Sequence, residues 1–327
     1  MRIAVTGATG FLGRALVRRL LSDNAALQIL ARPSQKSARL LEDFESRGAK
    51  IIPGELHDED AVARAIKDAE IVYHLAAKVD SSGFPRDFIE ANLQGTERIL
   101  KAALAQKVRR VIYTSSIAVY GLARPGLPID ESTPFDDRPR ERDLYAQSKI
   151  LADQFATAFA GETGLPLTIL RPGIIYGPGK PLPIALLGFP AGSTNAIFGN
   201  PANRFPLIFI ENLIDAMQQA AAADAPQLQQ FILLDDDNLT LGAYHAARSA
   251  ADGTKPLFLP TWPVQLSAAF VDTVRLLFPR SNPALSQHQI QRSLQDRHYS
   301  TTHLRKSLNW SPTISLEAAL QNCQAVS

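Results

Sequence analysis

Tyr145 and Lys149 stand four residues apart in the segment Tyr-Ala-Gln-Ser-Lys, so a helix would place both side chains on one face. A phenol has a pKa of about 10 and is a poor base at neutral pH, but a neighbouring ammonium favours its ionised form. Ser116 follows an apolar run at 111–114, and its hydroxyl could hydrogen-bond a substrate oxygen. These three residue types predict general acid–base chemistry on a carbon–oxygen group. The competing interpretation is a surface tyrosine and lysine on an amphipathic helix, because this spacing also arises by chance.

A glycine-rich segment near the start of the chain has the pattern of a dinucleotide-binding loop. Gly7, Gly10 and Gly13 follow an apolar run at 2–6 and precede apolar residues at helical spacing between 12 and 20. The first glycine permits a tight turn, the second leaves room for a pyrophosphate, and the third lets the helix pack closely on the strand. The start of the helix favours the phosphate charge. We therefore expect a cofactor loop over residues 7–13, although a glycine triplet also marks ordinary turns.

Strand-like and helix-like segments alternate through the first half of the chain, which predicts a parallel sheet with helices on both faces. The expected strands are 2–6, 28–31, 49–53, 71–75, 111–114 and 167–170. The expected helices are 38–47, 59–67, 88–106 and 144–160. The predicted fold class is α/β, with a Rossmann-type doubly wound parallel sheet and a smaller C-terminal substrate-binding lobe.

Prolines interrupt this alternation after Gly177, at positions 178, 181, 183, 190, 201 and 206. We expect a dinucleotide-binding domain over 1–177 and a mainly substrate-binding lobe over 178–327. A return segment at 207–240, helix-like over 211–223 and strand-like over 230–234, would rejoin the first domain. The stretch 121–142 is rich in Pro, Arg and Asp and predicts a long functional loop.

The bulk properties exclude several classes of function. The chain has 327 residues, a net charge of +2 and 20% charged residues, so no nucleic-acid partner is expected. Cys323 is the only cysteine, which excludes an internal disulfide and fits a cytoplasmic location. The six histidines form no H-x-x-x-H pair, so no metal site is expected. No signal peptide is expected, because glycines break the N-terminal apolar run at once. No integral membrane segment is expected either, because no stretch reaches about 20 apolar residues.

With these residues in view, the chain resembles the extended short-chain dehydrogenases/reductases of the NAD(P)-dependent epimerase/dehydratase family. The segments that carry the resemblance are 6–13 (TGATGFLG), 54–56 (GEL), 74–77 (HLAA), 91–96 (ANLQGT), 114–121 (TSSIAVYG), Tyr145 with Lys149, and 171–179 (RPGIIYGPG). They cover residues 1–180 densely, and 209–212 (FIEN) and 308–312 (LNWSP) extend the match more thinly.

The resemblance implies a role for each matching residue. Ser116 would polarise the substrate, Tyr145 would be the acid/base, and Lys149 would tune Tyr145 and bind the nicotinamide ribose. Besides Tyr145 and Lys149, the cofactor-binding positions on these segments are Gly7, Thr9, Gly10, Phe11, Leu12, Gly13, Glu55, Leu56, Leu75, Ala76, Ala77, Asn92, Thr114, Pro172, Gly173, Ile174 and Ile175. Glu55 departs from the Asp that the family usually has beside the adenine, and Glu is longer.

The end of the second expected strand bears on the choice of cofactor. In NAD-preferring relatives an acidic residue stands there and accepts the ribose 2′-OH. Here the sequence reads Gln-Ile-Leu-Ala-Arg-Pro-Ser over 28–34, and Arg32 could bind a 2′-phosphate with help from Lys36 or Arg39. We therefore favour NADP(H) over NAD(H). The alternatives are that Arg32 is a solvated loop residue or stacks on the adenine.

The leading functional interpretation is an oxidoreductase that interconverts a secondary alcohol and a ketone on a small molecule, either a nucleotide sugar or a sterol-like compound. One alternative is a nucleotide-sugar 4-epimerase with tightly bound NAD, and another is a non-catalytic cofactor-sensing protein. Gly173 stands where 4-epimerases of the family usually have Asn. Arg204 and Arg292 are the arginines that could bind a diphosphate, although such residues are more often solvated.

Two further segments point to the 3β-hydroxysteroid-dehydrogenase-like and 4-ketoreductase branches of the family. One is 209–212, and the other is the apolar stretch 263–278. That stretch could line a substrate pocket or lie against a membrane surface, but it could equally be core or a dimer contact. The resemblance also implies a homodimer built on helices 88–106 and 144–160.

Overall fold

The computed structural model describes residues 1–79, 83–121, 126–180, 182–184, 187–224, 227–266 and 287–324. The chain forms two compact units, and each unit draws on several separate stretches of sequence. The first unit comprises Met1–Ser116, Ser148–Arg171 and Ile214–Phe231. The second comprises Ile117–Gln147, Pro172–Leu213 and Ile232–Ser327. The domain boundary expected at residue 177 stays a prediction.

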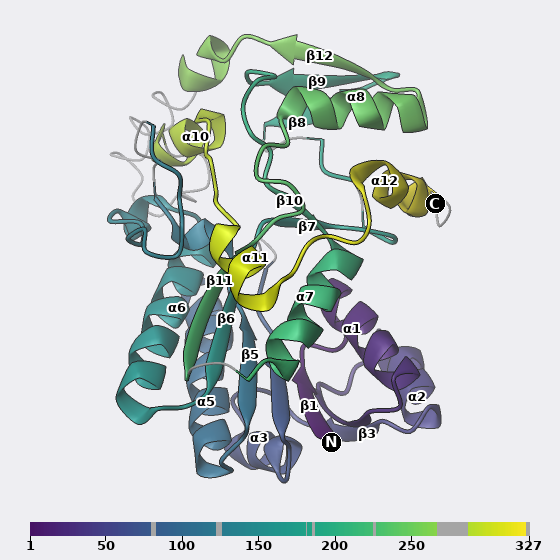
Figure 1. The fold of residues 1–327 in the computed structure, drawn as a ribbon, viewed down its shortest axis with the longest axis vertical. Helices are drawn as coiled ribbons and strands as arrows, with labels where there is room; N and C mark the ends of the chain where they lie inside the picture. Colours follow the sequence, from purple (N-terminus) through teal and green to yellow (C-terminus); the bar gives the residue numbers. More distant parts are fainter. Residues whose placement is uncertain are drawn as a thin grey trace. The chain divides into compact units, whose positions relative to one another are not determined.

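A seven-stranded sheet forms the centre of the first unit, in the order β11-β6-β5-β4-β1-β2-β3 (Figure 1). Its strands are β1 (Arg2–Thr6), β2 (Ala26–Ala31), β3 (Lys50–Pro53), β4 (Ile71–His74), β5 (Arg110–Thr114), β6 (Leu167–Pro172) and β11 (Leu228–Leu233). Neighbouring strands from β3 to β6 pair in parallel. The central strands read as continuous apolar runs because helices bury both faces of a parallel sheet. The predicted Rossmann-type α/β fold is confirmed.

The helices of this part of the chain alternate with its strands. They are α1 (Phe11–Ser22), α2 (Ala38–Ser46), α3 (Glu59–Ile66), α4 (Pro85–Phe88), α5 (Gly95–Ala105), α6 (Leu144–Thr163) and α7 (Ile210–Ala222). Apolar residues of α3, α5 and α6 pack on one face of the sheet in a single cluster. On the other face α1 and α7 lie side by side, joined by an ion pair of 2.8 Å between Arg19 and Asp215 (Figure 1).

The order of the strands reverses next to β1. The chain runs outward through β2 and β3 and then returns to place β4 on the opposite side of β1. In such sheets ligands bind beyond the carboxyl ends of the strands at this reversal. Because β1 leads directly into the glycine-rich loop and β4 leads into Leu75, both segments stand at the reversal.

The prediction of one continuous α-helix over 88–106 is wrong for the first third of that range. The short helix α4 ends at Phe88, a π-helical segment runs over Ile89–Gln94, and α5 begins only at Gly95. A π-helical turn is wider than an α-helical one and often marks a functional position. Here it contains Asn92, whose buried side chain bonds to the backbone of Lys78.

The second unit contains short elements, as the run of prolines predicts. Its strands are β7 (Ile174–Tyr176), β8 (Gly188–Ala191), β9 (Thr194–Phe198), β10 (Leu207–Phe209) and β12 (Lys255–Leu259). Its helices are α8 (Leu241–Asp252), α10 (Gln287–Leu294), α11 (Thr302–Leu308) and α12 (Leu316–Gln324). β7 pairs with β10, and a small sheet has the order β12-β9-β8.

The loop expected over 121–142 and the apolar stretch 263–278 both belong to the second unit in sequence. The stretch 121–142 is a loop in its described residues, with a short 3-10 helix at Pro139–Glu141. Most of the apolar stretch 263–278 lies outside the described residues, which stop at 266 and resume at 287. Where the structure describes the chain, no helix is both long and apolar enough to cross a bilayer.

Candidate active site

The glycine-rich loop leaves no room for a side chain at Gly7 or Gly13. Gly7 adopts a φ of +77°, a left-handed conformation that favours glycine. A Cβ on Gly13 would lie 2.0 Å from the Gly7 carbonyl oxygen, and one on Gly7 would lie 2.5 Å from the Ala76 nitrogen. Gly10 caps α1, and the first turn of that helix carries no acidic side chain. The loop therefore offers backbone N–H groups and the positive end of a helix dipole, which fits a phosphate.

The residues between these glycines differ in what they can offer to a ligand. Thr9 is exposed and Phe11 is half-buried, so both side chains reach the surface of the first unit. Leu12 is buried in the core, so only its backbone is available. The sequence does not separate these cases, because all three residues lie in one contiguous motif.

The segments that follow the neighbouring strands lie along the same edge of the sheet. Leu75, Ala76 and Ala77 are half-buried directly after β4. Arg32 follows β2 and is exposed, and Glu55 follows β3 and is exposed with its carboxylate 3.5 Å from Nδ1 of His57. Parallel strands end at one edge, so the fold places these groups where a dinucleotide would extend from the glycine loop.

Leu56 and Asn92 have packing roles that the sequence does not reveal. Leu56 fills the space beside Gly95, where a Cβ would lie 2.7 Å from Leu56 Cδ1. The amide of Asn92 accepts from the Lys78 nitrogen at 2.7 Å and donates to the Lys78 carbonyl at 3.0 Å. The same amide donates to the Ser148 hydroxyl at 2.8 Å, which links the π-helical segment to α6.

Lys149 is buried on α6, and its ammonium points at the carboxyl end of β5. Nζ donates to the Thr114 carbonyl at 2.8 Å and lies 5.1 Å from the centre of the Tyr113 ring. Burial lowers the pKa of Lys149 to about 8, and the charge of Asp153, one helical turn further on, opposes that shift. A buried lysine held in this way is a positively charged group close to its titration point at neutral pH.

A buried ion pair behind Lys149 is absent from the sequence-based list of site residues. Arg171 on β6 holds Asp153 through two bonds of 2.9 and 2.8 Å, and both side chains are almost fully buried. The Ser115 hydroxyl donates to the same carboxylate at 2.6 Å. The only sequence signal is the spacing of Lys149 and Asp153 on one helix face, because Ser115 and Arg171 approach through the sheet.

Two predicted catalytic residues stand close in the chain to these groups. Tyr145 lies in the first turn of α6, one turn before Lys149, and is half-buried. Ser116 is half-buried two residues beyond the end of β5. Thr114, at that end, has a buried hydroxyl with no hydrogen-bond partner among the described residues, which leaves it able to bind a ligand. The meeting of Ser116, Tyr145 and Lys149 at a substrate stays a prediction.

The remaining predicted positions, 172–175, belong to the second unit. Pro172 is buried, and Gly173, Ile174 and Ile175 are half-buried around β7. A Cβ on Gly173 would lie 2.5 Å from both Leu234 Cδ2 and the Pro206 carbonyl oxygen. An Asn could not occupy this position without displacing the backbone around it.

The two arginines considered for a diphosphate are engaged with other groups of the second unit. Arg204 forms an ion pair with Asp296, which also accepts from the Arg204 backbone nitrogen at 2.8 Å. Arg292 is buried and donates to the carbonyls of Tyr120 and Ile117, each at 3.3 Å. Burial lowers the pKa of Arg292 to about 9. The expectation that such residues are solvated is therefore wrong for Arg292, whose role is to bind backbone carbonyls.

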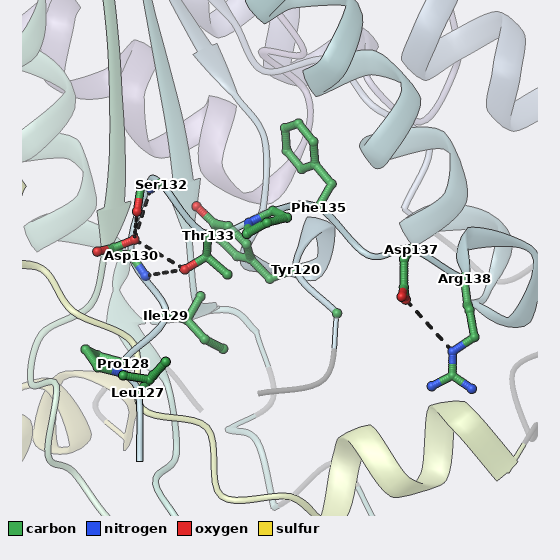
Figure 2. A pocket seen from close by; sticks show the side chains of 12 residues that line it. Tyr120, Leu127, Pro128, Ile129, Asp130, Ser132, Thr133, Phe135, Asp137 and Arg138 are labelled. Atoms are coloured by element: carbon green, nitrogen blue, oxygen red, sulfur yellow. Dashed lines mark hydrogen bonds and ion pairs between the residues drawn. The ribbon is translucent and has the colours of Figure 1, made fainter. Parts of the chain in front are cut away.

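A pocket of about 570 Å³ lies along the loop after Tyr120 (Figure 2). Its apolar lining includes Leu127, Ile129 and Phe135. Its charged lining is mostly acidic: Asp130 accepts bonds from Ser132 and Thr133, and Asp137 lies 3.9 Å from Arg138 (Figure 2). The pocket therefore suits an uncharged, largely apolar group better than an anion.

The chain is similar in sequence and in fold to known proteins. The sequence model of the "NAD dependent epimerase/dehydratase family" matches residues 3–231. The chain is 25% identical to a 2-alkyl-3-oxoalkanoate reductase of Shewanella oneidensis, over 98% of this chain and 85% of the relative. It is 26% identical to a 3 beta-hydroxysteroid dehydrogenase/Delta 5-->4-isomerase of Mycobacterium tuberculosis, over 98% and 89%. The crystal structure of gox2253 superposes with a TM-score of 0.81 at 25% identity, over 100% of this chain and 97% of that one.

Proposed function

The chain belongs to the NAD dependent epimerase/dehydratase family, and on that premise we propose that it interconverts a secondary alcohol and a ketone. Its relatives are named reductases, dehydrogenases and epimerases, so it is an enzyme of that type with a nicotinamide cofactor. The single observation that carries the proposal is the buried Lys149 ammonium on α6, one turn from Tyr145. A bound nicotinamide dinucleotide would donate or accept the hydride.

In this proposal Tyr145 is the acid/base of the reaction. The positive charge of Lys149 favours the phenolate of Tyr145 and brings its pKa toward a range useful for proton transfer. In the reducing direction Tyr145 gives its proton to the ketone oxygen, while the Ser116 hydroxyl donates a hydrogen bond to that oxygen. Asp153 and Arg171 hold Ser115 and α6 in place behind these groups. The residues act together to stabilise charge that develops on one oxygen.

The residues of the first unit fit a dinucleotide. The loop at Gly7, Gly10 and Gly13 would hold the pyrophosphate, because the glycines expose backbone N–H groups at the start of α1. The buried Thr114 hydroxyl would bond to the ribose next to the nicotinamide. Arg32 is exposed where an NAD-binding carboxylate would stand, which supports NADP(H) over NAD(H).

For the substrate we favour a ketone or alcohol on a largely hydrocarbon skeleton. Gly173 leaves no space for the Asn that 4-epimerases of the family usually have. Arg204 is paired with Asp296 through Nη1, and Arg292 donates to backbone carbonyls, so both arginines already have partners that a diphosphate would have to compete with. The names of the two long relatives describe an oxo or hydroxy group on such a skeleton. A nucleotide sugar is the less favoured substrate.

The proposal is tested by assaying the purified enzyme with NADPH and NADH against a ketosteroid, a 3-oxoalkanoate and UDP-glucose. We expect stoichiometric oxidation of the reduced dinucleotide with one of the first two ketones, and stronger binding of NADPH. An Arg32→Glu variant should reverse the cofactor preference. Epimerisation of UDP-glucose by NAD that copurifies with the protein, without net oxidation, would refute the reductase proposal.

We further propose a homodimer, as the family resemblance implies. Leu151 is 41% exposed on α6, and the half-buried Phe155 and Phe159 follow it at four-residue spacing. Phe155 and Phe159 stack with their ring centres 5.5 Å apart, so they form a rigid apolar ridge. A partly exposed ridge of this kind on α6 suits helix-to-helix contact with a second copy.

A further inference from the structure

His74 is a fully buried histidine that the proposed reaction does not use. It ends β4, directly before Leu75, and none of its surface is exposed. Both ring nitrogens have partners: Nδ1 lies 2.7 Å from the Thr6 hydroxyl and Nε2 lies 3.0 Å from the Thr96 hydroxyl. Thr6 ends β1 and is the register partner of His74 across the two strands. The ring therefore links the last residue before the glycine-rich loop to α5.

The direction of each hydrogen bond in this group can be worked out from Thr96. Its hydroxyl has a single proton, which it donates to the Asn92 carbonyl at 2.6 Å. Toward His74 it can only accept, so Nε2 must carry a proton. A neutral imidazole has one N–H, and Nδ1 is then the acceptor of the Thr6 proton. The Thr6 oxygen is left to accept from the Ala76 backbone N–H at 3.4 Å.

The chain of bonds continues from Asn92 to α6. The Asn92 side chain holds the Lys78 backbone and donates to the hydroxyl of Ser148, the residue before Lys149. One continuous set of hydrogen bonds thus joins the segment after β4, at Ala76, to β1, to α5 and to α6, the helix that carries Lys149. All of them lie in the first unit.

The surroundings of His74 disfavour a second proton on the ring. Burial, followed by the nearby charge of Lys149, lowers the pKa of His74 to about 3. The Tyr113 ring stacks on the imidazole with centres 5.5 Å apart and adds no charge. A protonated ring would also reverse the bond to Thr6 and leave the proton of that hydroxyl without an acceptor in the chain just described.

The glycine-rich loop and the segment after β4 lie very close to each other. A Cβ on Gly7 would meet the Ala76 nitrogen at 2.5 Å, so the glycine-rich loop and the segment after β4 are in direct contact. Thr6 and His74 are the residues immediately before these two segments. A small change in their hydrogen bond would therefore change the gap between the two walls of the expected cofactor cleft.

We propose that His74, held as the neutral Nε2–H tautomer, is a positioning residue that sets the glycine-rich loop against the Leu75–Ala77 wall for dinucleotide binding. The same bonds tie this gap to α6 through Thr96, Asn92 and Ser148. The proposal rests on the proposed function only for the identity of the ligand. It assigns His74 no contact with substrate and no proton transfer.

The tautomer is tested first, in the wild-type protein, and a variant serves only to assign the signals. Histidine-selective ¹⁵N labelling of the wild-type protein gives ring-nitrogen signals for six histidines, and the His74 pair is assigned by its loss in a His74→Gln variant. From pH 8 to pH 5 we expect one protonated and one unprotonated nitrogen at His74, with the proton on Nε2. A proton on Nδ1, or protonation of both nitrogens in this range, would overturn the proposal.

The positioning role is tested by a matched pair of variants at Thr96, which touches no ligand in the proposed reaction. Thr96→Val keeps the shape but removes the hydroxyl, and Thr96→Ser keeps the hydroxyl. We expect Thr96→Val to weaken dinucleotide binding about tenfold, equivalent to about 1.4 kcal/mol. We expect Thr96→Ser to bind the dinucleotide with the affinity of the wild type. Binding is measured by dinucleotide fluorescence on the fraction that is folded in thermal unfolding.

The outcomes separate this proposal from the proposed function. If the wild-type protein binds neither NADPH nor NADH, the proposed function is wrong. The positioning role of His74 in dinucleotide binding is then wrong as well, whichever tautomer is found. Wild-type binding with equal affinity in Thr96→Val and Thr96→Ser would overturn the positioning role alone. If Thr96→Val does not fold, a Thr6→Val and Thr6→Ser pair tests the other end of the same bond with the same expected contrast.

Discussion

At the scale of single residues, the site depends on groups whose properties are set by burial. Lys149 is charged in a place where burial disfavours charge, and it is held there by one carbonyl and by Asp153 one turn away. Gly13 has no side chain because the Gly7 carbonyl occupies that space. Each of these conditions can be changed by one substitution.

Gly13→Ala should abolish dinucleotide binding and destabilise the fold by about 2 kcal/mol, typical of over-packing. The added methyl would lie 2.0 Å from the Gly7 oxygen, so the loop must open. Gly161→Ala is the control, because position 161 is exposed on α6 with nothing within 4 Å of its Cβ. The control should gain roughly 0.5–1 kcal/mol from helix propensity. Thermal unfolding measures the change in stability, and fluorescence titration measures dinucleotide affinity. A Gly13→Ala protein with wild-type affinity would contradict the proposed role of the glycine-rich loop in binding the pyrophosphate.

The pH dependence of ketone reduction should report Lys149. Its pKa in the folded protein is about 8, below the 10.5 of a free lysine, so the ammonium is lost as pH rises through about 8. Because kcat/KM reflects ionisations of the free enzyme, it should decline above about pH 8. In Lys149→Arg the guanidinium stays protonated, so the remaining activity should decline only at higher pH. An identical descending limb in both proteins would show that Lys149 is not the titrating group.

At the scale of elements, three pieces of secondary structure are joined behind the site by one carboxylate. Asp153 on α6 is bonded to Arg171 on β6 and to Ser115 just beyond β5. Removing one partner of a buried pair leaves an unpaired charge, which costs more than the pair itself contributes. The ends of β5, β6 and α6 should therefore loosen together.

Asp153→Asn should lower the free energy of unfolding by about 3–5 kcal/mol, because it leaves Arg171 buried without a counter-charge. Glu97→Gln is the matched control: Glu97 and Lys101 also form an ion pair, at 2.6 Å, but on the exposed surface of α5. The control should change stability by less than about 0.5 kcal/mol. Urea unfolding of the three proteins measures the contrast, and equal small effects would mean that the buried pair is dispensable.

Much of this architecture can be predicted from the sequence because its signals are local. The glycine-rich loop, the apolar strands and the Tyr145–Lys149 spacing each lie within a few residues, and the observed elements agree within one to three residues at most ends. The Asp153–Arg171 pair could not be predicted, since its partners are 18 residues apart and meet only through the sheet. The π-helical turn around Asn92 has no sequence signature, because it depends on which backbone carbonyls are bonded. Short strands such as β8 and β12 carry too few residues to show a period.

At the scale of the whole molecule, a pocket in the second unit and a ridge on α6 are the surfaces expected to meet other molecules. The pocket of the second unit has an apolar lining that includes Leu127, Ile129 and Phe135, and its charged residues are Asp130, Asp137 and Arg138. The first unit presents an apolar ridge on α6, in which Leu151 is exposed and Phe155 and Phe159 are half-buried. We expect the former to favour a largely apolar part of a substrate and the latter to favour a second copy of the chain.

The proposed homodimer predicts that the protein sediments at twice its monomer mass of 35.6 kDa at micromolar concentration. Leu151→Glu should give a monomer, because it would bury a carboxylate in an apolar contact. Leu257→Glu is the control, since Leu257 on β12 is also about half exposed but belongs to another element, in the second unit. A monomeric wild-type protein, or a Leu151→Glu dimer of unchanged strength, would contradict the proposed interface.

The most direct test of the account is the turnover of Tyr145→Phe measured together with its dinucleotide affinity. Tyr145 is proposed to move the proton and not to be required for holding the cofactor, so the variant should bind NADPH like the wild type. Its kcat for ketone reduction should fall by about 10²–10⁴-fold, the usual contribution of general acid–base catalysis. Turnover close to that of the wild type, with binding intact, would show that the proton comes from another group and that the proposed mechanism is wrong.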